Sequence, residues 1–131
     1  MSYYPENLQY TKDHEWVEAS GGDRARVGLT EFAQKQLGDI VFVDVPTVDR
    51  DVEAGDPLGT VESVKSVSEI FAPVSGRVTA RNDALEADPE LVNTDPYDDG
   101  WIVEIQLAGA TLPDGLLSAA QYAQYVAAES E

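Results

Sequence analysis

The chain has 131 residues, and its 25 acidic and 8 basic side chains give a formal net charge of −17 at pH 7. This length fits one domain with a modest core, and this charge repels nucleic acid and anionic membranes, because phosphate binding needs clustered Lys and Arg. The chain has no cysteine and a single histidine, which excludes disulfides, thiolate nucleophiles and metal sites made of several histidines.

The first third of the chain predicts two strands and a helix. "EWVEA" (15–19) and "ARVGL" (25–29) suit short strands, and the glycines between them suit a hairpin loop. "TEFAQKQLG" (30–38) predicts a helix of about two turns. Thr30 is a good residue for its N-terminal cap, and Gly38 suits the stop at its C-terminal end.

The middle of the chain reads as a series of short strands. "DIVFVDVP" (39–46) is rich in β-branched and aromatic residues and predicts a strand that ends at the proline. A turn then leads into a strand at "LGTVE" (58–62). Another strand begins at Val67 and breaks at Pro73, and a further one begins at Arg77.

The last third of the chain combines a polar segment, a strand and a helix. Residues 82–100 are broken by two prolines and leave room for one short helical turn. "WIVEIQL" (101–107) predicts a strand, and apolar residues at helical spacing predict an amphipathic C-terminal helix over about 114–128. The many short strands favour an antiparallel β-sandwich or flattened barrel with short peripheral helices.

A lysine stands at the centre of one predicted hairpin. Lys65 lies in "SVKS" (63–66), which is compatible with a tight connection although it lacks the Asn-Gly or Gly-Gly that two-residue hairpin loops prefer. An amine held in solvent on such a support suits covalent modification by a separate enzyme. From the spacing alone, an ordinary solvated turn residue is the favoured interpretation, as it is for almost any lone lysine.

Several motifs in chain order resemble the glycine cleavage system H protein family. "VESVKSVSEIFAPVSGRV" resembles its lipoyl-attachment region. Two other families that modify a lysine resemble this motif less. Biotin carriers usually flank their lysine with methionines, and lipoyl domains of 2-oxo acid dehydrogenase acyltransferases usually have Asp before it and Ala after it. The resemblance also includes the C-terminal helix and four further segments, so that it covers nearly the whole chain: "YTKDHEW", "VGLTEFAQKQLGDIVFVDVP", "AGDPLGTVES" and "ELVNTDPYDDGWIVEI".

The resemblance implies a fold and a cofactor. It implies one lipoyl-carrier domain over 1–131, mainly β, with the barrel-sandwich hybrid fold (the lipoyl/biotinyl-type hammerhead), short peripheral helices and a C-terminal helix. Within it we expect an N-terminal extension over about 1–25, a lipoyl core over about 26–107, and the helix over about 114–128. Lys65 is expected to carry lipoic acid as an amide.

The resemblance also implies a role. The protein would be a non-catalytic carrier that shuttles the aminomethyl group of glycine from glycine dehydrogenase (P protein) to aminomethyltransferase (T protein). Dihydrolipoyl dehydrogenase (L protein) would reoxidise the arm, and another enzyme would attach it. The family docks the loaded arm in a cleft, for which His14, Glu15 and Glu69 are the candidates here. Their alternatives are a hydrogen-bonded structural imidazole for His14 and plain surface charge for the two carboxylates.

Other functions remain open from the residues alone. The protein could instead relay lipoyl groups to other enzymes or serve a 2-oxo acid dehydrogenase complex. A hydrolase with paired carboxylates (Asp98 with Asp99, or Glu86 with Asp88) and an acidic interaction module without a cofactor are further alternatives. No segment suits a membrane span, and the N-terminus lacks the profile of a secretory signal, so a cytoplasmic protein is expected, and we expect a monomer.

Overall fold

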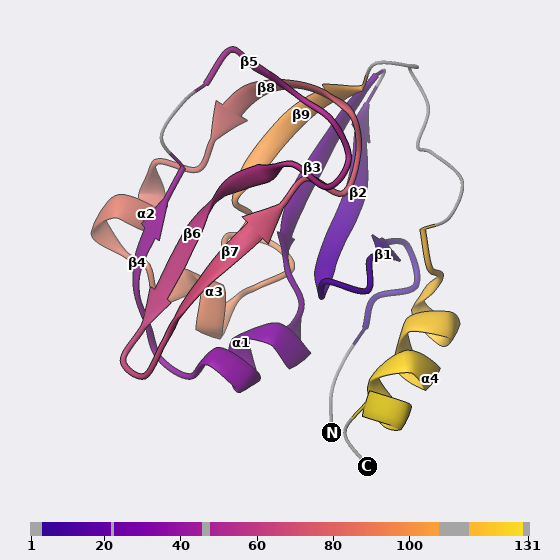
Figure 1. The fold of residues 1–131 in the computed structure, drawn as a ribbon, viewed down its shortest axis with the longest axis vertical. Coiled ribbons are helices and arrows are strands. Elements are labelled where there is room, and N and C mark those ends of the chain that lie inside the picture. The colour runs from indigo at the N-terminus through magenta and orange to yellow at the C-terminus, as the bar shows by residue number, and fades with distance from the viewer. Residues whose placement is uncertain (1–3, 22, 46–47, 108–115, 130–131) are drawn as a thin grey trace.

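The computed structural model describes residues 4–21, 23–45, 48–107 and 116–129, and in them two antiparallel sheets face each other (Figure 1). The prediction of a mainly β sandwich with short helices is therefore confirmed. One sheet has six strands, in the order β1 (Gln9–Tyr10), β2 (Glu15–Gly21), β3 (Arg24–Leu29), β9 (Val103–Leu107), β8 (Gly76–Arg81) and β5 (Arg50–Val52). The other sheet has three strands, in the order β4 (Ile40–Asp44), β6 (Pro57–Ser63) and β7 (Val67–Phe71).

Two of these strands were not predicted from the sequence. β1 has two residues and β5 has three, which is too short for an alternating apolar pattern to be recognised. β9 begins at Val103 and not at Trp101, because the Trp101 N–H is used in a turn and donates to the carbonyl of Asp98 at 3.1 Å. The strand therefore begins two residues later than the composition suggests, although the Ile102 N–H already donates to the Val27 carbonyl on β3 at 2.8 Å.

Four helices are present in the described part of the chain. They are α1 (Glu31–Leu37), α2 (Ala84–Ala87), α3 (Leu91–Thr94) and α4 (Ala119–Glu129). The caps predicted for α1 are confirmed, since Thr30 Oγ1 accepts from the Ala33 N–H and Gly38 follows the last turn with a φ of 84°. Two short helices, and not one, occupy the polar segment. Pro89 separates them because a proline interrupts a helix yet suits the start of the next turn, where its carbonyl accepts from the Val92 N–H.

α4 begins later than the predicted start near residue 114. Residues 114 and 115 lie outside the described ranges, and among the described ones the helix starts at Ala119. Before it, Leu117 pairs with Tyr10 through two backbone hydrogen bonds of 2.8 and 2.7 Å. Ser118 and Gln121 then form a capping box, in which each side chain accepts from the backbone N–H of the other.

The core has two parts. The main part fills the space between the sheets and is rich in valine, isoleucine and leucine. The second part lies under α4 and is aromatic: the rings of Tyr10 and Tyr122 stack with centroids 4.7 Å apart, and Trp16 beside them is 1% exposed. Trp16 is therefore a core residue, and this second part of the core places α4 against β1 and the turn that precedes β2.

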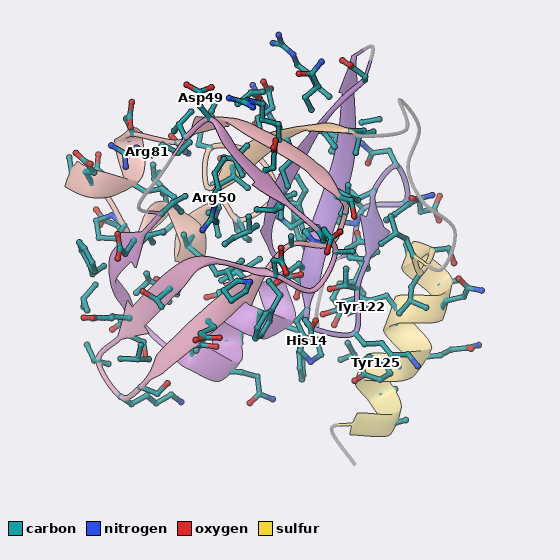
Figure 2. All side chains as sticks on the ribbon, turned by 45° about the horizontal axis from the view of Figure 1, so that its top comes forward. His14, Asp49, Arg50, Arg81, Tyr122 and Tyr125 are labelled. Atoms are coloured by element: carbon teal, nitrogen blue, oxygen red, sulfur yellow. The ribbon has the colours of Figure 1, made fainter. Side chains whose placement is uncertain are left out.

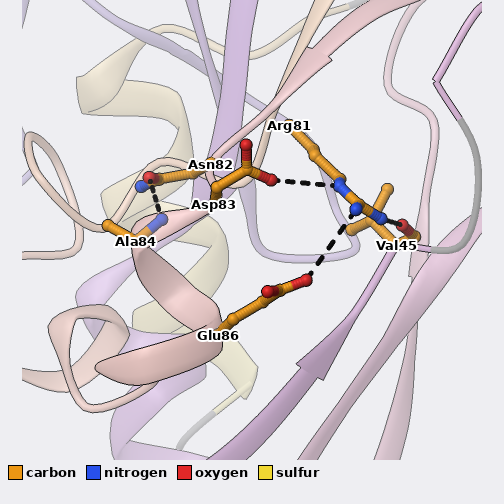
Figure 3. Close-up of polar contacts among 6 residues, drawn as sticks. All are labelled: Val45, Arg81, Asn82, Asp83, Ala84 and Glu86. Atoms are coloured by element: carbon orange, nitrogen blue, oxygen red, sulfur yellow. Dashed lines mark hydrogen bonds and ion pairs between the residues drawn. The ribbon is translucent and has the colours of Figure 1, made fainter.

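Arg81 joins the two sheets at one end (Figure 3). Its Nη1 donates to the carbonyl of Val45 at 2.9 Å, just beyond β4, and its Nε lies 3.2 Å from the carboxylate of Asp83. Nη2 lies 3.8 Å from the carboxylate of Glu86 on α2. The end of β4 is thereby tied to β8 and α2. No helix in the part of the chain that the structure describes is long and apolar enough to span a membrane.

Candidate functional site

Lys65 lies at the tip of the hairpin between β6 and β7, which reaches the lower left of the view in Figure 1 near α1. The tight connection predicted there is confirmed. The Ser63 N–H donates to the carbonyl of Ser66 at 2.8 Å, so that Val64 and Lys65 form a two-residue loop. The hydroxyl oxygen of Ser63 accepts from the N–H groups of Lys65 (3.3 Å) and Ser66 (3.1 Å). A serine side chain therefore fixes the backbone around the lysine.

This loop contains no glycine, and its backbone differs from that of the usual glycine-containing two-residue hairpin loops in the sign of φ. Among the described residues other than glycine, only His14 and Asp49 have a positive φ. Val64 and Lys65 therefore keep negative φ values, which a β-branched valine tolerates. The Val64 N–H also donates to the carbonyl of Asp39 at 3.0 Å and ties the tip to the residue before β4.

Asn93, on α3, forms hydrogen bonds with the segment that connects α1 to β4, next to the hairpin tip. Its Oδ1 accepts from the Ile40 N–H at 2.8 Å, and its Nδ2 donates to the Gly38 carbonyl at 2.9 Å and to Gln34 Oε1 at 2.8 Å. One side chain thus fixes the end of α1 and the start of β4. The exposed Lys65 side chain lies over Gly38, where an added Cβ would stand 3.4 Å from Lys65 Cε. The glycine leaves room for the stem of the lysine as well as ending the helix.

A groove of about 200 Å³ lies between α1, β7 and the turn before β2. A second hollow of about 270 Å³ lies beside it and is lined by Phe32, Lys35, Gln36 and Lys65. The two hollows share Phe32 and Gln36, so the hollow beside the lysine adjoins the groove along α1. The groove itself is lined by Asp13, His14, Leu29, Phe32, Ala33, Gln36, Leu37, Val61, Ser68, Glu69 and Ile70.

His14 and Glu69, two of the three predicted cleft residues, line the groove. Glu69 is exposed on β7. His14 has a φ of 66°, and its Nδ1 lies 2.8 Å from the hydroxyl of Tyr122 on α4 (Figure 2). Its ring also contacts Phe32, with centroids 4.7 Å apart. The imidazole is therefore a hydrogen-bonded part of the structure and a wall of the groove at once.

Glu15, the third predicted residue, is not among the residues that line the groove. It is 1% exposed, which rules out the alternative of plain surface charge. Its Oε2 accepts from the Phe71 N–H at 2.7 Å, and its Oε1 accepts from the Thr11 hydroxyl at 3.3 Å. Burial raises the pKa of Glu15 to about 8, against the effect of the Phe71 hydrogen bond and with a smaller contribution from the charge of Asp13.

Tyr122 is a residue that the sequence did not single out. It is fully buried, and its hydroxyl lies 2.8 Å from Thr30 Oγ1 as well as from His14 Nδ1. It connects α4 with the groove wall and with the N-terminal cap of α1. The signal for it was its place on the apolar stripe of the C-terminal helix, between Ala119 and Val126.

The paired carboxylates considered for a hydrolase do not meet in an apolar pocket. Glu86 and Asp88 are exposed at and just after α2, and Asp98 and Asp99 are exposed in the turn before β9. A catalytic carboxyl pair needs two groups whose surroundings push their pKa values apart, usually through burial. The arrangement of these four side chains does not favour a carboxylate-based hydrolase.

Comparisons with known proteins agree with the geometry. The family model described as "Glycine cleavage H-protein" matches residues 8–129. The chain is 53% identical over 126 residues to the glycine cleavage system H protein of Herpetosiphon aurantiacus, covering 96% of this chain and 95% of the relative. It is 51% identical over 129 residues to that of Halorhodospira halophila, covering 98% and 99%.

A solved structure gives the same result. The crystal structure of a glycine cleavage system H protein from Mycobacterium marinum superposes with a TM-score of 0.84 at 38% identity, covering 98% of this chain and 100% of that one. This agreement confirms the predicted barrel-sandwich hybrid fold. Sequence and structure together show that the chain belongs to the glycine cleavage H-protein family.

Proposed function

We propose that this protein is the lipoyl carrier of the glycine cleavage system and that Lys65 bears the lipoyl group as an amide on Nζ. The single observation that carries the assignment is the exposed lysine on a rigid hairpin tip, next to a hollow that adjoins a groove. The protein is a non-catalytic carrier, and the alternative of a lipoyl relay is not favoured.

The other lysines are less suited to carry the arm. The chain has three lysines. Lys35 Nζ lies 2.9 Å from the carboxylate of Glu31, which is one turn away on α1. Lys12 Nζ lies 5.8 Å from the centre of the Tyr125 ring, so its charge already has an aromatic partner. Lys65 is the lysine that a hairpin presents to an approaching enzyme.

The residues around Lys65 suit a long, tethered group. When attached, the lipoyl group would supply a disulfide that accepts the aminomethyl group on one sulfur as the S–S bond opens, and reoxidation of the dithiol would restore that bond. Phe32, Gln36 and the apolar residues of the groove offer the arm a path along α1. Glu69 offers a carboxylate to a positively charged amine at its end, and His14 forms part of the wall there. Glu15 lies behind the groove and holds the backbone of β7 in place.

The partners follow from this role. We propose that glycine dehydrogenase, aminomethyltransferase and dihydrolipoyl dehydrogenase each use the arm in turn, and that a separate enzyme attaches it. A tether gives a high effective concentration at each active site without a permanent complex. We expect a monomer in the cytoplasm, as the sequence predicts.

Intact mass spectrometry of the protein, isolated from cells that modify their other lipoyl proteins, tests the assignment. The wild type and a Lys35→Arg control are expected to gain one lipoyl group, and Lys65→Arg is expected to gain none. Peptide mapping would place the added mass on Lys65. A wild-type protein without the modification, or a lipoylated Lys65→Arg variant, would contradict the proposal.

A further inference from the structure

The exposed large hydrophobic side chains of the described residues gather around Lys65. They are Val41, Phe42, Val64 and Val67, which are 47 to 70% exposed. Val64 and Val67 flank the lysine in sequence, and Val41 and Phe42 lie on β4, which pairs with β6. Single exposed hydrophobic residues are normal, but a group of them in one place marks an interaction site.

Strand register places two of these side chains, Phe42 and Val67, on one face. Phe42 pairs with Glu62, and Glu62 pairs with Val67, so the three form one row across the three-stranded sheet. The next row, Val43 with Val61, is buried on the opposite face. Directly paired residues point to the same side of a sheet. The outer face next to the lysine therefore carries two apolar side chains with a carboxylate between them.

We call Val41, Phe42, Glu62, Val64 and Val67 the tip patch. Further carboxylates surround it: Asp39 and Asp44 at the two ends of β4 and Glu69 on β7 are exposed. The nearby basic side chain of Lys35 is paired with Glu31. An apolar centre bordered by negative charge is complementary to an apolar cleft bordered by Lys and Arg.

We infer that the tip patch is the docking surface for the enzyme that acylates Lys65, and that this enzyme presents an apolar cleft with a basic border. The inference rests on the proposed function. In the reaction, an amide bond forms between Nζ and the acyl carbon of an acyl adenylate or acyl thioester. The bond from that carbon to the leaving oxygen or sulfur breaks, and the amine gives up a proton.

The geometry of that step selects this enzyme among the partners. To form the amide bond, its active site must come within bonding distance of Nζ, at the end of a lysine stem. It therefore has to approach the hairpin tip, where the exposed Val64 and Val67 lie one and two residues from the lysine in sequence. Enzymes that use the finished arm act at its far end and can remain one arm's length away. The tip patch is accordingly better suited to bind the enzyme that attaches the arm than the enzymes that use it.

The test measures enzymatic acylation of the unmodified protein by a purified lipoyl- or octanoyl-attaching enzyme, followed by intact mass. Phe42→Ser and Val67→Ser are each expected to lower kcat/KM about tenfold, as for a residue at the centre of an interface. Val48→Ser, at a half-buried valine outside the tip patch, is the control for the loss of an apolar side chain elsewhere. Glu62→Lys is expected to lower kcat/KM and to weaken its dependence on salt, whereas Glu53→Lys, in the connection between β5 and β6, leaves both unchanged.

Two further measurements separate docking from other effects. Chemical acetylation of Lys65 by a small reagent is expected to proceed at the same rate in all variants, because it needs no docking. If the chemical rate fell in a variant by as much as the enzymatic rate, the inference would be overturned. Equal enzymatic rates in every variant would also overturn it. A further contrary result would be a wild-type dimer, seen by light scattering, that the Phe42→Ser substitution dissociates. If the wild type is not acylated on Lys65 at all, it is the proposed function that fails.

Discussion

At the scale of single residues, Glu69 is the carboxylate best placed to meet a positively charged amine on the docked arm. It is exposed on β7, four residues after Lys65, and it lines the groove. Removing its charge should weaken the hold on the loaded end of the arm. We expect Glu69→Gln to raise the rate at which the loaded protein loses its amine about three- to tenfold, because one charge-assisted hydrogen bond at an exposed site contributes about 1 kcal/mol.

The measurement follows the intact mass of the loaded protein over time, with no aminomethyltransferase present. Glu53→Gln, at an exposed acidic residue in the connection between β5 and β6, is the control and should match the wild type. An unchanged rate in Glu69→Gln would remove this carboxylate from the groove's function and leave the attachment site on Lys65 untouched.

At the scale of elements, α4 reaches the groove through one hydroxyl. Tyr122 is fully buried, and its Oη lies 2.8 Å from both His14 Nδ1 and Thr30 Oγ1. Tyr122→Phe would keep the ring stacked on Tyr10 and remove only this contact. We expect a loss of about 1–2 kcal/mol in the free energy of unfolding, because the buried Thr30 hydroxyl and the half-buried His14 ring each lose a hydrogen-bond partner.

The same variant should also move the His14 imidazole signals in NMR spectra, which a loss of stability alone would not do. Tyr125→Phe is the control, since the Tyr125 hydroxyl donates to the Lys12 carbonyl at 3.4 Å and lies in an exposed setting. Unmoved His14 signals in Tyr122→Phe would show that α4 does not position the groove wall.

The elements also show how far sequence reasoning reaches. α1 was predicted because its cap at Thr30 and its stop at Gly38 are local signals. The start of α4 was missed although Ser118 and Gln121 form a recognisable capping box, because the apolar spacing continues before them. The hydrogen bond between Asn93 and Ile40 could not be predicted from the sequence. The two residues are 53 positions apart and come together only in the folded chain.

The candidate site divides in the same way. Lys65, His14 and Glu69 were all proposed through the family resemblance, Lys65 from a contiguous motif and the other two by their position. The burial of Glu15 was not foreseen. It occupies the first position of β2, where the alternating pattern does not decide which way the side chain faces, and its partner at Phe71 comes from the other sheet.

At the scale of the whole molecule, Glu15 joins the two sheets and makes the stability of the fold depend on pH. Its carboxylate, on the six-stranded sheet, accepts from the Phe71 N–H on the three-stranded one. Burial raises its pKa from 4.5 to about 8, so the native state holds a proton that the unfolded state releases. The resulting stabilisation is complete below pH 4.5 and is lost as the pH rises through 8.

Glu15→Gln keeps an oxygen that accepts from Phe71 and removes the titration. The free energy of unfolding of the wild type, relative to this variant, is therefore expected to fall by on the order of a few kcal/mol between pH 4.5 and pH 8. Denaturant unfolding at a series of pH values measures it, with Glu18→Gln on the same strand as the control. Parallel curves for the wild type and Glu15→Gln would mean that this carboxyl titrates alike in the native and unfolded states. The burial of Glu15 would then not be the source of any pH dependence in the junction between the sheets.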